Sequence, residues 1–180
     1  MKKPHLWLYL VLAIALLATS CKKKSSPEPN DDPELPPKTQ TGADTFGCRI
    51  NGVPWIPKGI PFSVSRLVAS YDSNFLNGTL NITARRRLST SSETIILFSD
   101  SLKTIGTYPL TIPKKQGAEY INWDNGNCSF HARDIYERVG TMTLTKLDIR
   151  NNIVSGTFEF TLKRPECTIT ATNGRFDIKL

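Results

Sequence analysis

The sequence has few of the residues that enzymes use most often. It holds two histidines, four cysteines and two methionines, and His131 is the only histidine after residue 20. It contains no G-x-S-x-G, no H-E-x-x-H and no glycine-rich phosphate loop. In CSFHARD, Cys128 and Phe130 share one parity, which places His131 on the opposite, wet face. The sequence therefore predicts a protein that is not an enzyme and has no cofactor or metal site.

The sequence also lacks an apolar run that is long enough to cross a bilayer. Residues 6–18 are uncharged and apolar for 13 residues, whereas a spanning helix needs about 20. Lys2 and Lys3 precede this run, and small residues follow it up to Ser20. A basic start, a short apolar stretch and small residues before a cut are typical of a secretory signal peptide, which we assign to residues 1–20.

Cleavage after Ser20 would make Cys21 the first residue of the mature chain. This arrangement resembles the lipobox of bacterial lipoproteins, in which the cysteine thiol receives a diacylglycerol, although Ala18 stands where lipoboxes usually carry leucine. The resemblance implies lipidation of Cys21, with the usual palmitate-type acyl chains, and a membrane as partner. Cleavage at the same bond without lipid is the alternative.

Residues 21–44 contain five prolines, three consecutive lysines and many small polar residues, with Leu35 almost the only large apolar side chain. Such a composition buries too little surface to offset its ordering entropy. We therefore expect a disordered tether over 21–44 and one folded domain over 45–180.

The charge of the mature chain is positive but scattered. Removal of residues 1–20 leaves 21 Lys and Arg against 16 Asp and Glu. This excess favours solubility and is too diffuse to indicate nucleic acid.

From residue 46 onward, apolar and polar residues alternate, which is typical of antiparallel strands with one face in water. In IVSGTFEFTL (153–162), every apolar residue from Phe158 to Leu162 has the same parity, and GTMTLTKLDI (140–149) alternates before it. CSFHA (128–132) and the apolar run ETIILF (93–98) are further strand candidates, the latter covered on both faces. The pattern predicts an all-β fold, an antiparallel sandwich or barrel-like meander of about nine strands, with no substantial helix after the signal peptide.

The last segment, 167–180, changes parity between Ala171 and Phe176. A β-bulge at Asn173-Gly174 would bring the apolar residues on both sides of it to the core, because one extra residue reverses the alternation.

Three cysteines lie in the domain: Cys48, Cys128 and Cys167. An exported chain meets oxidising conditions, so one disulfide and one free thiol are expected. Spacing leaves all three pairings open. A meander that curls round brings its first and last strands together, which favours Cys48 with Cys167.

Two groups of residues are candidates for ligand contact. Trp55 and Trp123 lie beside turns, where aromatic rings stack on ligands or close the ends of a β core. Arg85, Arg86 and Arg87 form the densest basic spot, either as a solvated hairpin end or as a site for an anionic group.

The segment FGCRINGVPW (46–55) resembles the opening of an uncharacterised family of Bacteroidota lipoproteins, with the pattern FGC-x-[VI]-NG-x-x-[WF]. NGRFDIKL (173–180) is similar to the family's usual ending. The resemblance implies an all-β fold and a lipid anchor in the outer membrane, and it leaves the periplasmic and surface faces both open. It brings no catalytic residue.

Two functions remain at this point. The first is a lipid-anchored envelope protein that acts as a non-catalytic binding or accessory module for a glycan, peptide or protein. The second is a lipocalin-like carrier of a small apolar ligand, which would need an internal cavity of several hundred Å³.

Overall fold

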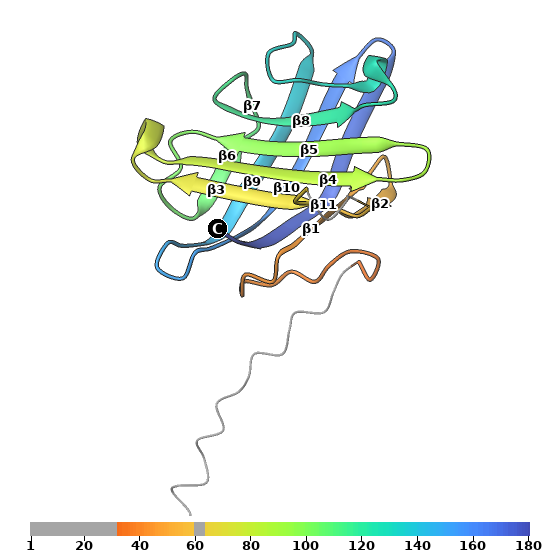
Figure 1. The fold of residues 1–180 in the computed structure, drawn as a ribbon. Helices are drawn as coiled ribbons and strands as arrows, with labels where there is room; N and C mark the ends of the chain where they lie inside the picture. The colour runs from red at the N-terminus through yellow and green to blue at the C-terminus, as the bar shows by residue number, and fades with distance from the viewer. Residues whose placement is uncertain (1–31, 60–63) are drawn as a thin grey trace, which may run out of the picture.

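The alternating residues form the facing layers of two antiparallel sheets in the computed structural model, which describes residues 32–59 and 64–180 (Figure 1). The six-stranded sheet has the order β2 (Val53–Trp55), β1 (Thr45–Ile50), β11 (Cys167–Lys179), β10 (Ile153–Arg164), β9 (Glu137–Asp148) and β6 (Gly106–Pro109). The five-stranded sheet has the order β3 (Leu67–Asp72), β4 (Thr79–Arg87), β5 (Ser92–Ser99), β8 (Gln116–Asn122) and β7 (Thr111–Ile112). The predicted all-β fold is confirmed, and the sheets form an open sandwich.

The described residues contain eleven strands, where the sequence indicated about nine. The short strands β2 and β7 were not anticipated. CSFHA is not a strand: it holds the end of the 3₁₀ turn η2 (Gly126–Cys128) and a single bridge between Phe130 and Tyr120. A second 3₁₀ turn, η1, spans Phe75–Asn77. In the described part of the chain, no helix is both long and apolar enough to cross a membrane.

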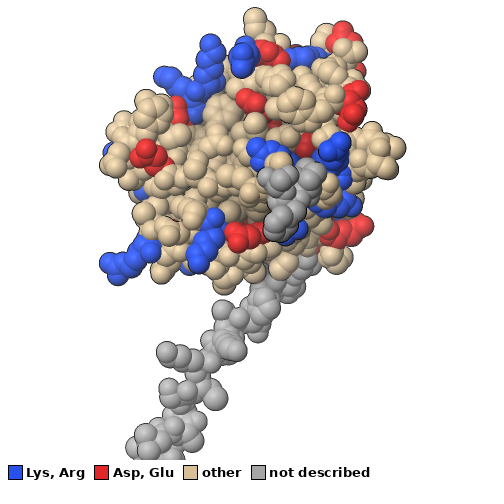
Figure 2. Space-filling model, in the orientation of Figure 1, with Lys and Arg blue, Asp and Glu red and all other residues tan. Residues whose placement is uncertain are grey.

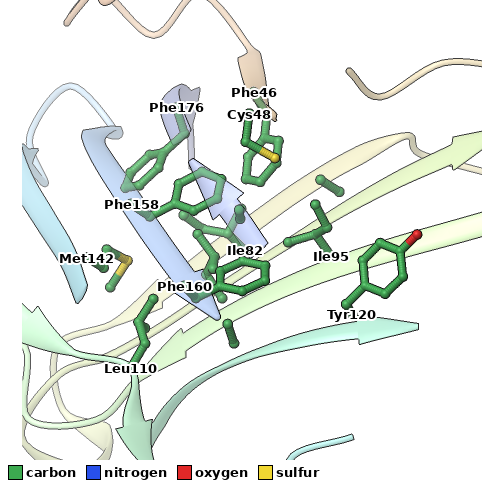
Figure 3. Packing of buried hydrophobic residues seen from close by; sticks show 14 of the residues in the cluster. Phe46, Cys48, Ile82, Ile95, Leu110, Tyr120, Met142, Phe158, Phe160 and Phe176 are labelled. Carbon is green, nitrogen blue, oxygen red and sulfur yellow. The ribbon is translucent and has the colours of Figure 1, made fainter. Parts of the chain in front are cut away.

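Aromatic rings from the six-stranded sheet fill the space between the layers (Figure 3). The ring of Phe158 stacks on Phe46 at 5.0 Å and on Phe176 at 6.5 Å between centroids. Ile82 and Ile95 of the five-stranded sheet are fully buried in the same cluster. Full burial of such side chains contributes about 1.5–3 kcal/mol each, so this packed layer is the main source of stability.

The predicted change of parity near the C-terminus is confirmed. The β10–β11 register shifts between Phe158 and Phe160, and Asn173 adopts a positive φ of 53°. Ala171 and Phe176 are therefore both buried, although their spacing would place them on opposite faces of a regular strand.

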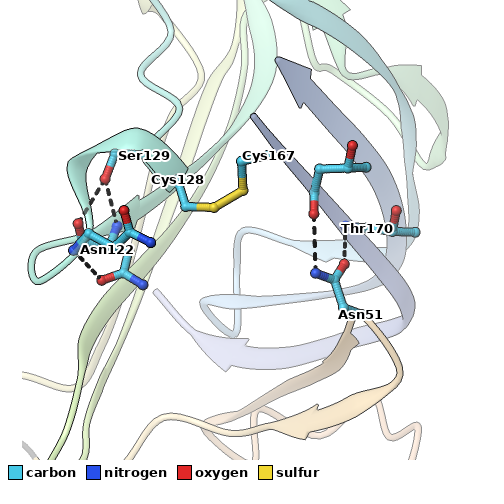
Figure 4. The surroundings of a disulfide bond; sticks show 8 residues. Asn51, Asn122, Cys128, Ser129, Cys167 and Thr170 are labelled. Atoms are coloured by element: carbon cyan, nitrogen blue, oxygen red, sulfur yellow. Dashed lines mark hydrogen bonds between the residues drawn. A yellow bond between two sulfur atoms is a disulfide. The ribbon is translucent and has the colours of Figure 1, made fainter. Parts of the chain in front are cut away.

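The hairpin between β1 and β2 explains part of the FGC-x-I-NG pattern. Asn51 and Gly52 have φ values of 49° and 82°, as a tight two-residue hairpin requires at both central positions. The Asn51 side chain also donates to the carbonyl oxygen of Thr168 and accepts from the amide of Thr170, which fixes the turn against β11 (Figure 4).

The predicted boundary of the tether is wrong for residues 32–44, which pack on the domain as a strap across the outer face of the six-stranded sheet. Residues 1–31, including the expected signal peptide and Cys21, lie outside the described residues. Leu35 is buried, and a β-carbon on Gly47 would approach Pro36 to 2.7 Å, so the glycine makes room for the strap. At the start of the strap, Asp32 accepts from Arg49 at 2.6 Å. Composition alone missed this order because polar contacts, not apolar burial, hold most of it.

The predicted pairing of Cys48 with Cys167 is also wrong. The disulfide joins Cys128 to Cys167 with Cα atoms 5.5 Å apart, and Cys48 is a buried free thiol (Figure 4). The first and last strands do lie side by side, as expected, but β1 pairs with residues 171–177 of β11 and Cys167 lies well before them. The observed bond instead ties the loop after β8, in one sheet, to the first residue of β11, in the other.

We predict that the Cys128–Cys167 bond stabilises the domain by constraining the unfolded chain. The two cysteines are 39 residues apart, which corresponds to about 4 kcal/mol as an upper value. Replacing both by Ser should lower the free energy of unfolding in urea by up to this amount. Non-reducing peptide mapping should find this one bond, with Cys48 alkylated only after unfolding because burial raises the pKa of its thiol. A Cys48 cross-link in the map would contradict the assignment.

Candidate functional site

Two of the residues predicted to contact a ligand pack against each other, one of them inside the core. Trp55 is fully buried, and its Nε1 donates to Glu93 Oε2 at 2.6 Å. Arg86 donates to the same carboxylate at 2.7 Å, and its guanidinium lies 5.3 Å from the centroid of the Trp55 ring. Burial, and then the adjacent Glu93 carboxylate, raise the pKa of Tyr120 beside them. The ligand-contact interpretation of Trp55 and Arg86 is therefore wrong: they form a paired polar cluster between β2, β4 and β5.

The other predicted contacts remain at the surface. Trp123 is 67% exposed, and its Nε1 donates to Thr94 Oγ1 at 3.4 Å. Arg85, opposite Thr94 in register, donates to the carbonyl oxygen of Ser65. Arg87 is exposed at the end of β4. The structure thus places Trp123 and Arg85 on one side of the five-stranded sheet.

Threonine hydroxyls converge on the opposite side of the molecule, on the outer face of the six-stranded sheet. Thr143 of β9 lies opposite Thr157 of β10, and Thr141 lies opposite Glu159. The Thr143 hydroxyl is 2.9 Å from that of Thr107 on β6. The row follows from the strand alternation, because the residues between these positions point into the core.

Thr141, Thr143 and Thr157 form the floor of a groove with a volume of about 300 Å³. We call it the threonine groove, defined by Lys38, Thr141, Thr143, Thr157, Glu159 and Asn173. A second hollow of about 260 Å³ continues it along β9, β10 and β11 and shares Glu159. The groove is polar: its lining supplies hydroxyls, one amide, one carboxylate and one ammonium group.

The strap forms one wall of the threonine groove and contributes Lys38 to it. Asn173, at the bulge of β11, forms the neighbouring part of the wall, and its side chain donates to Asp32 at the start of the strap. Bulges redirect side chains and are frequent beside functional sites. The strap and the bulge of β11 therefore form the wall of the groove on this side of the sheet.

Asp177 of β11 holds the far end of the strap. Its carboxylate accepts hydrogen bonds from the hydroxyls of Thr39 (2.6 Å) and Ser155 (2.7 Å) and from the amides of Thr41 (2.9 Å), Gly42 (2.8 Å) and Ala43 (3.2 Å). Burial disfavours the charge, but these hydrogen bonds outweigh it and lower the pKa of Asp177 to about 2. At neutral pH the carboxylate is ionised and the strap is fixed.

The sequence carried only part of the signal for this groove. Its alternation assigned the threonines of β9 and β10 to the wet face, but exposed threonines are common in strands because of their β propensity. Lys38 was placed in the tether, where it had no structural context. The described residues contain no group of three or more His, Cys, Asp or Glu side chains arranged to hold a metal ion. His131 is half-buried and lies outside the groove lining.

A family model described as a domain of unknown function (DUF6252) matches residues 66–177. No curated protein and no solved structure matches the chain.

We predict that Asp177→Asn weakens the strap. The folded pKa of about 2 lies below the ordinary value of 3.8, so the carboxylate contributes stability above pH 4 that is lost as the pH falls through 2. The free energy of unfolding at pH 7 should fall by about 1–2 kcal/mol, and its decline between pH 4 and 2 should flatten.

The strap amides of residues 41–43 should also exchange faster with deuterium in this variant. Glu166→Gln, which removes an exposed carboxylate, is the control for loss of one surface charge. An unchanged pH dependence in Asp177→Asn would contradict the role given to this carboxylate.

Proposed function

The chain belongs to the DUF6252 family, a domain of unknown function, and we propose that it is a lipid-anchored envelope protein that binds a hydroxyl-rich ligand in the threonine groove without catalysing a reaction. Within this proposal the lipid is carried by Cys21, the protein is an outer-membrane lipoprotein of the Bacteroidota type, and the ligand is a glycan.

The convergence of hydroxyls in the groove is the observation that carries the proposal. A threonine hydroxyl donates one hydrogen bond and accepts others, as a sugar hydroxyl does, so a row of them matches a glycan without requiring a net charge. Glu159 and Asn173 at the edges add a strong acceptor and an amide that both donates and accepts. Because several side chains are held on rigid strands, binding costs little side-chain ordering.

The filled interior argues against the carrier function. A carrier keeps a cavity between its strands, whereas here the rings of Phe46, Phe158 and Phe160 and the aliphatic residues of β4 and β5 occupy the space between the sheets (Figure 3). The threonine groove lies on the outside of the sandwich, and its polar lining does not suit an apolar ligand.

The proposal assigns no turnover to the groove, because its lining includes no histidine or cysteine and its single carboxylate has no second carboxylate or base among the lining residues. General acid–base catalysis requires a positioned pair of proton donor and acceptor within reach of one substrate. The groove instead offers neutral hydrogen-bonding groups, which hold a ligand in place.

The groove is tested by Thr143→Val and Thr157→Val, which keep the side-chain shape and remove the hydroxyl. On a panel of immobilised oligosaccharides, each change should weaken binding about 5- to 50-fold, because a ligand hydroxyl loses its partner in the complex. Thr83→Val, on the outer face of the other sheet, is the matched control and should bind as the wild type does. Failure of the wild type to bind any panel member, or equal loss in Thr83→Val, would contradict the proposal.

The anchor is tested separately by Cys21→Ser. Without the thiol no diacylglycerol can be attached, so the protein should move from the membrane to the soluble fraction on centrifugation of lysed cells. The folded domain should be unchanged, as judged by its urea unfolding midpoint. Membrane association at the wild-type level in Cys21→Ser would contradict lipid anchoring while leaving the groove proposal intact.

A further inference from the structure

Strand β3 is an edge strand of the five-stranded sheet, and β4 is its only strand partner in the described part of the chain. The amide of Arg85 donates to the carbonyl oxygen of Arg66 at 2.7 Å, which identifies residue 66 as hydrogen-bonded to β4. Bonded and outward-facing residues alternate along an antiparallel strand. The backbone groups of Leu67, Ala69 and Tyr71 therefore point to the open edge.

This edge lacks the usual protection against pairing with another chain. Edge strands are commonly very short, or carry proline, inward charge or a bulge. β2 has three residues and contains Pro54, β6 ends in Pro109, and β7 has two residues. In contrast, β3 has six residues in unbroken register with β4 and no charge between Arg66 and Asp72.

The surface beside β3 leaves room for another strand. A groove of about 430 Å³ runs along the edge, lined by Ser65 to Ala69 from β3 and its approach, by Ile178 and Lys179 from the other sheet, and by Asp44 at the end of the strap. Val68 is 44% exposed within it. A strand added there would cover this side chain and satisfy the open backbone groups.

We propose that β3 pairs antiparallel with β3 of a second copy of this chain, with Ala69 opposite Ala69 of the second copy. In this register Leu67 of each copy lies opposite Tyr71 of the other copy. The three residues whose backbone groups point to the open edge therefore all form hydrogen-bonded pairs. The pairing makes six backbone hydrogen bonds and joins the two five-stranded sheets into one continuous sheet.

Charge complementarity selects this register. With Ala69 on the two-fold axis, Arg66 lies opposite Asp72 of the second copy, and symmetry repeats the pair at the other end. Both are non-bonded positions, where side chains of an antiparallel pair come closest and opposite charges stabilise. Both side chains are exposed in the single chain. A shift of two residues in either direction removes both charge pairs and leaves outward backbone groups unpaired.

The symmetry of the pair agrees with anchoring of both copies. The two-fold axis of an antiparallel strand pair is perpendicular to the sheet, so both straps, on the outer face of the six-stranded sheets, lie on one side of the assembly. Under the proposed lipid anchor, both chains then attach to the same membrane. On the opposite side of the assembly, the outer faces of the two five-stranded sheets lie next to each other. Figure 2 shows this face in one copy, and its middle carries few charged side chains.

A cross-linking experiment tests the register. Val68 lies opposite Ser70 of the second copy at a non-bonded position, where the Cα atoms are about 4.5 Å apart. On the full chain carrying Cys21→Ser, Val68→Cys and Ser70→Cys are made separately. Mild oxidation of the mixture should give a disulfide-linked dimer, and neither variant alone should do so. Equal cross-linking of each variant alone, or none in the mixture, would overturn the register.

Sedimentation velocity of the same chain, from about 5 to 500 µM, tests the interface itself. Ala69→Pro removes an amide that points to the open edge and none that bonds to β4, so the monomer should fold and the dimer dissociation constant should rise at least about 10-fold. Arg66→Glu should raise it about 3- to 10-fold.

Adding Asp72→Lys to Arg66→Glu should restore the dimer. Because the Asp72 carboxylate also caps the turn at Asn74 and Phe75, urea unfolding checks that the double variant is folded. If that variant is unfolded, the Ala69→Pro result and the cross-linking decide. A wild-type monomer at all concentrations, a dimer insensitive to Ala69→Pro, or a different protein seated on β3 would overturn the proposal. None of these outcomes bears on ligand binding in the threonine groove.

Discussion

The buried carboxylate of Asp177 is the interaction on which the outer surface of the protein depends. It lies on the outer face of β11 and collects hydrogen bonds from three amides and from hydroxyls of the strap and β10. Through it a proline-rich, polar segment with one buried leucine becomes ordered against a sheet. The order of the strap places Lys38 at the groove and adds residues 32–44 to the domain predicted over 45–180. The order of the strap, the wall of the threonine groove and the start of the domain therefore all depend on the hydrogen-bonded carboxylate of Asp177.

A second buried carboxylate, that of Glu93, has a different structural role. Glu93 and Arg86 form an ion pair between the sheets, and the indole N–H of Trp55 donates to the same carboxylate. Such a pair contributes little net stability, because desolvation offsets the attraction, but removing one partner costs about 3–5 kcal/mol. The cluster joins β2 of one sheet to β4 and β5 of the other, so it fixes how the layers meet. Trp55 and Arg86, which looked like ligand contacts in the sequence, are therefore part of the frame, and the groove proposed to bind a ligand lies on the opposite side of the six-stranded sheet.

Sequence reasoning succeeded where a single strand carries the information. Alternation predicted the all-β class, and the change of parity after Ala171 predicted the bulge at Asn173. It failed where two distant segments must meet. The strap depends on Asp177, 136 residues after Thr41, and the disulfide depends on the register of β11, which neither composition nor spacing contains. The threonine groove shares this property: its floor was visible as alternation, whereas its wall exists only in the folded chain.

The corrected boundary changes what a lipid on Cys21 would do. Between Cys21 and Asp32 there are ten residues, which reach about 35–40 Å at full extension. A tether running to residue 44 would have reached roughly twice as far. Two anchored copies would therefore stay close to one surface, where confinement raises their effective concentration and favours even a weak edge-to-edge contact. An unprotected edge strand promotes aggregation in free solution. Anchoring to a membrane would limit this association to neighbours in the plane of the membrane. Under the proposed lipid anchor, a short link and the open edge of β3 would both favour the pairing of neighbouring copies.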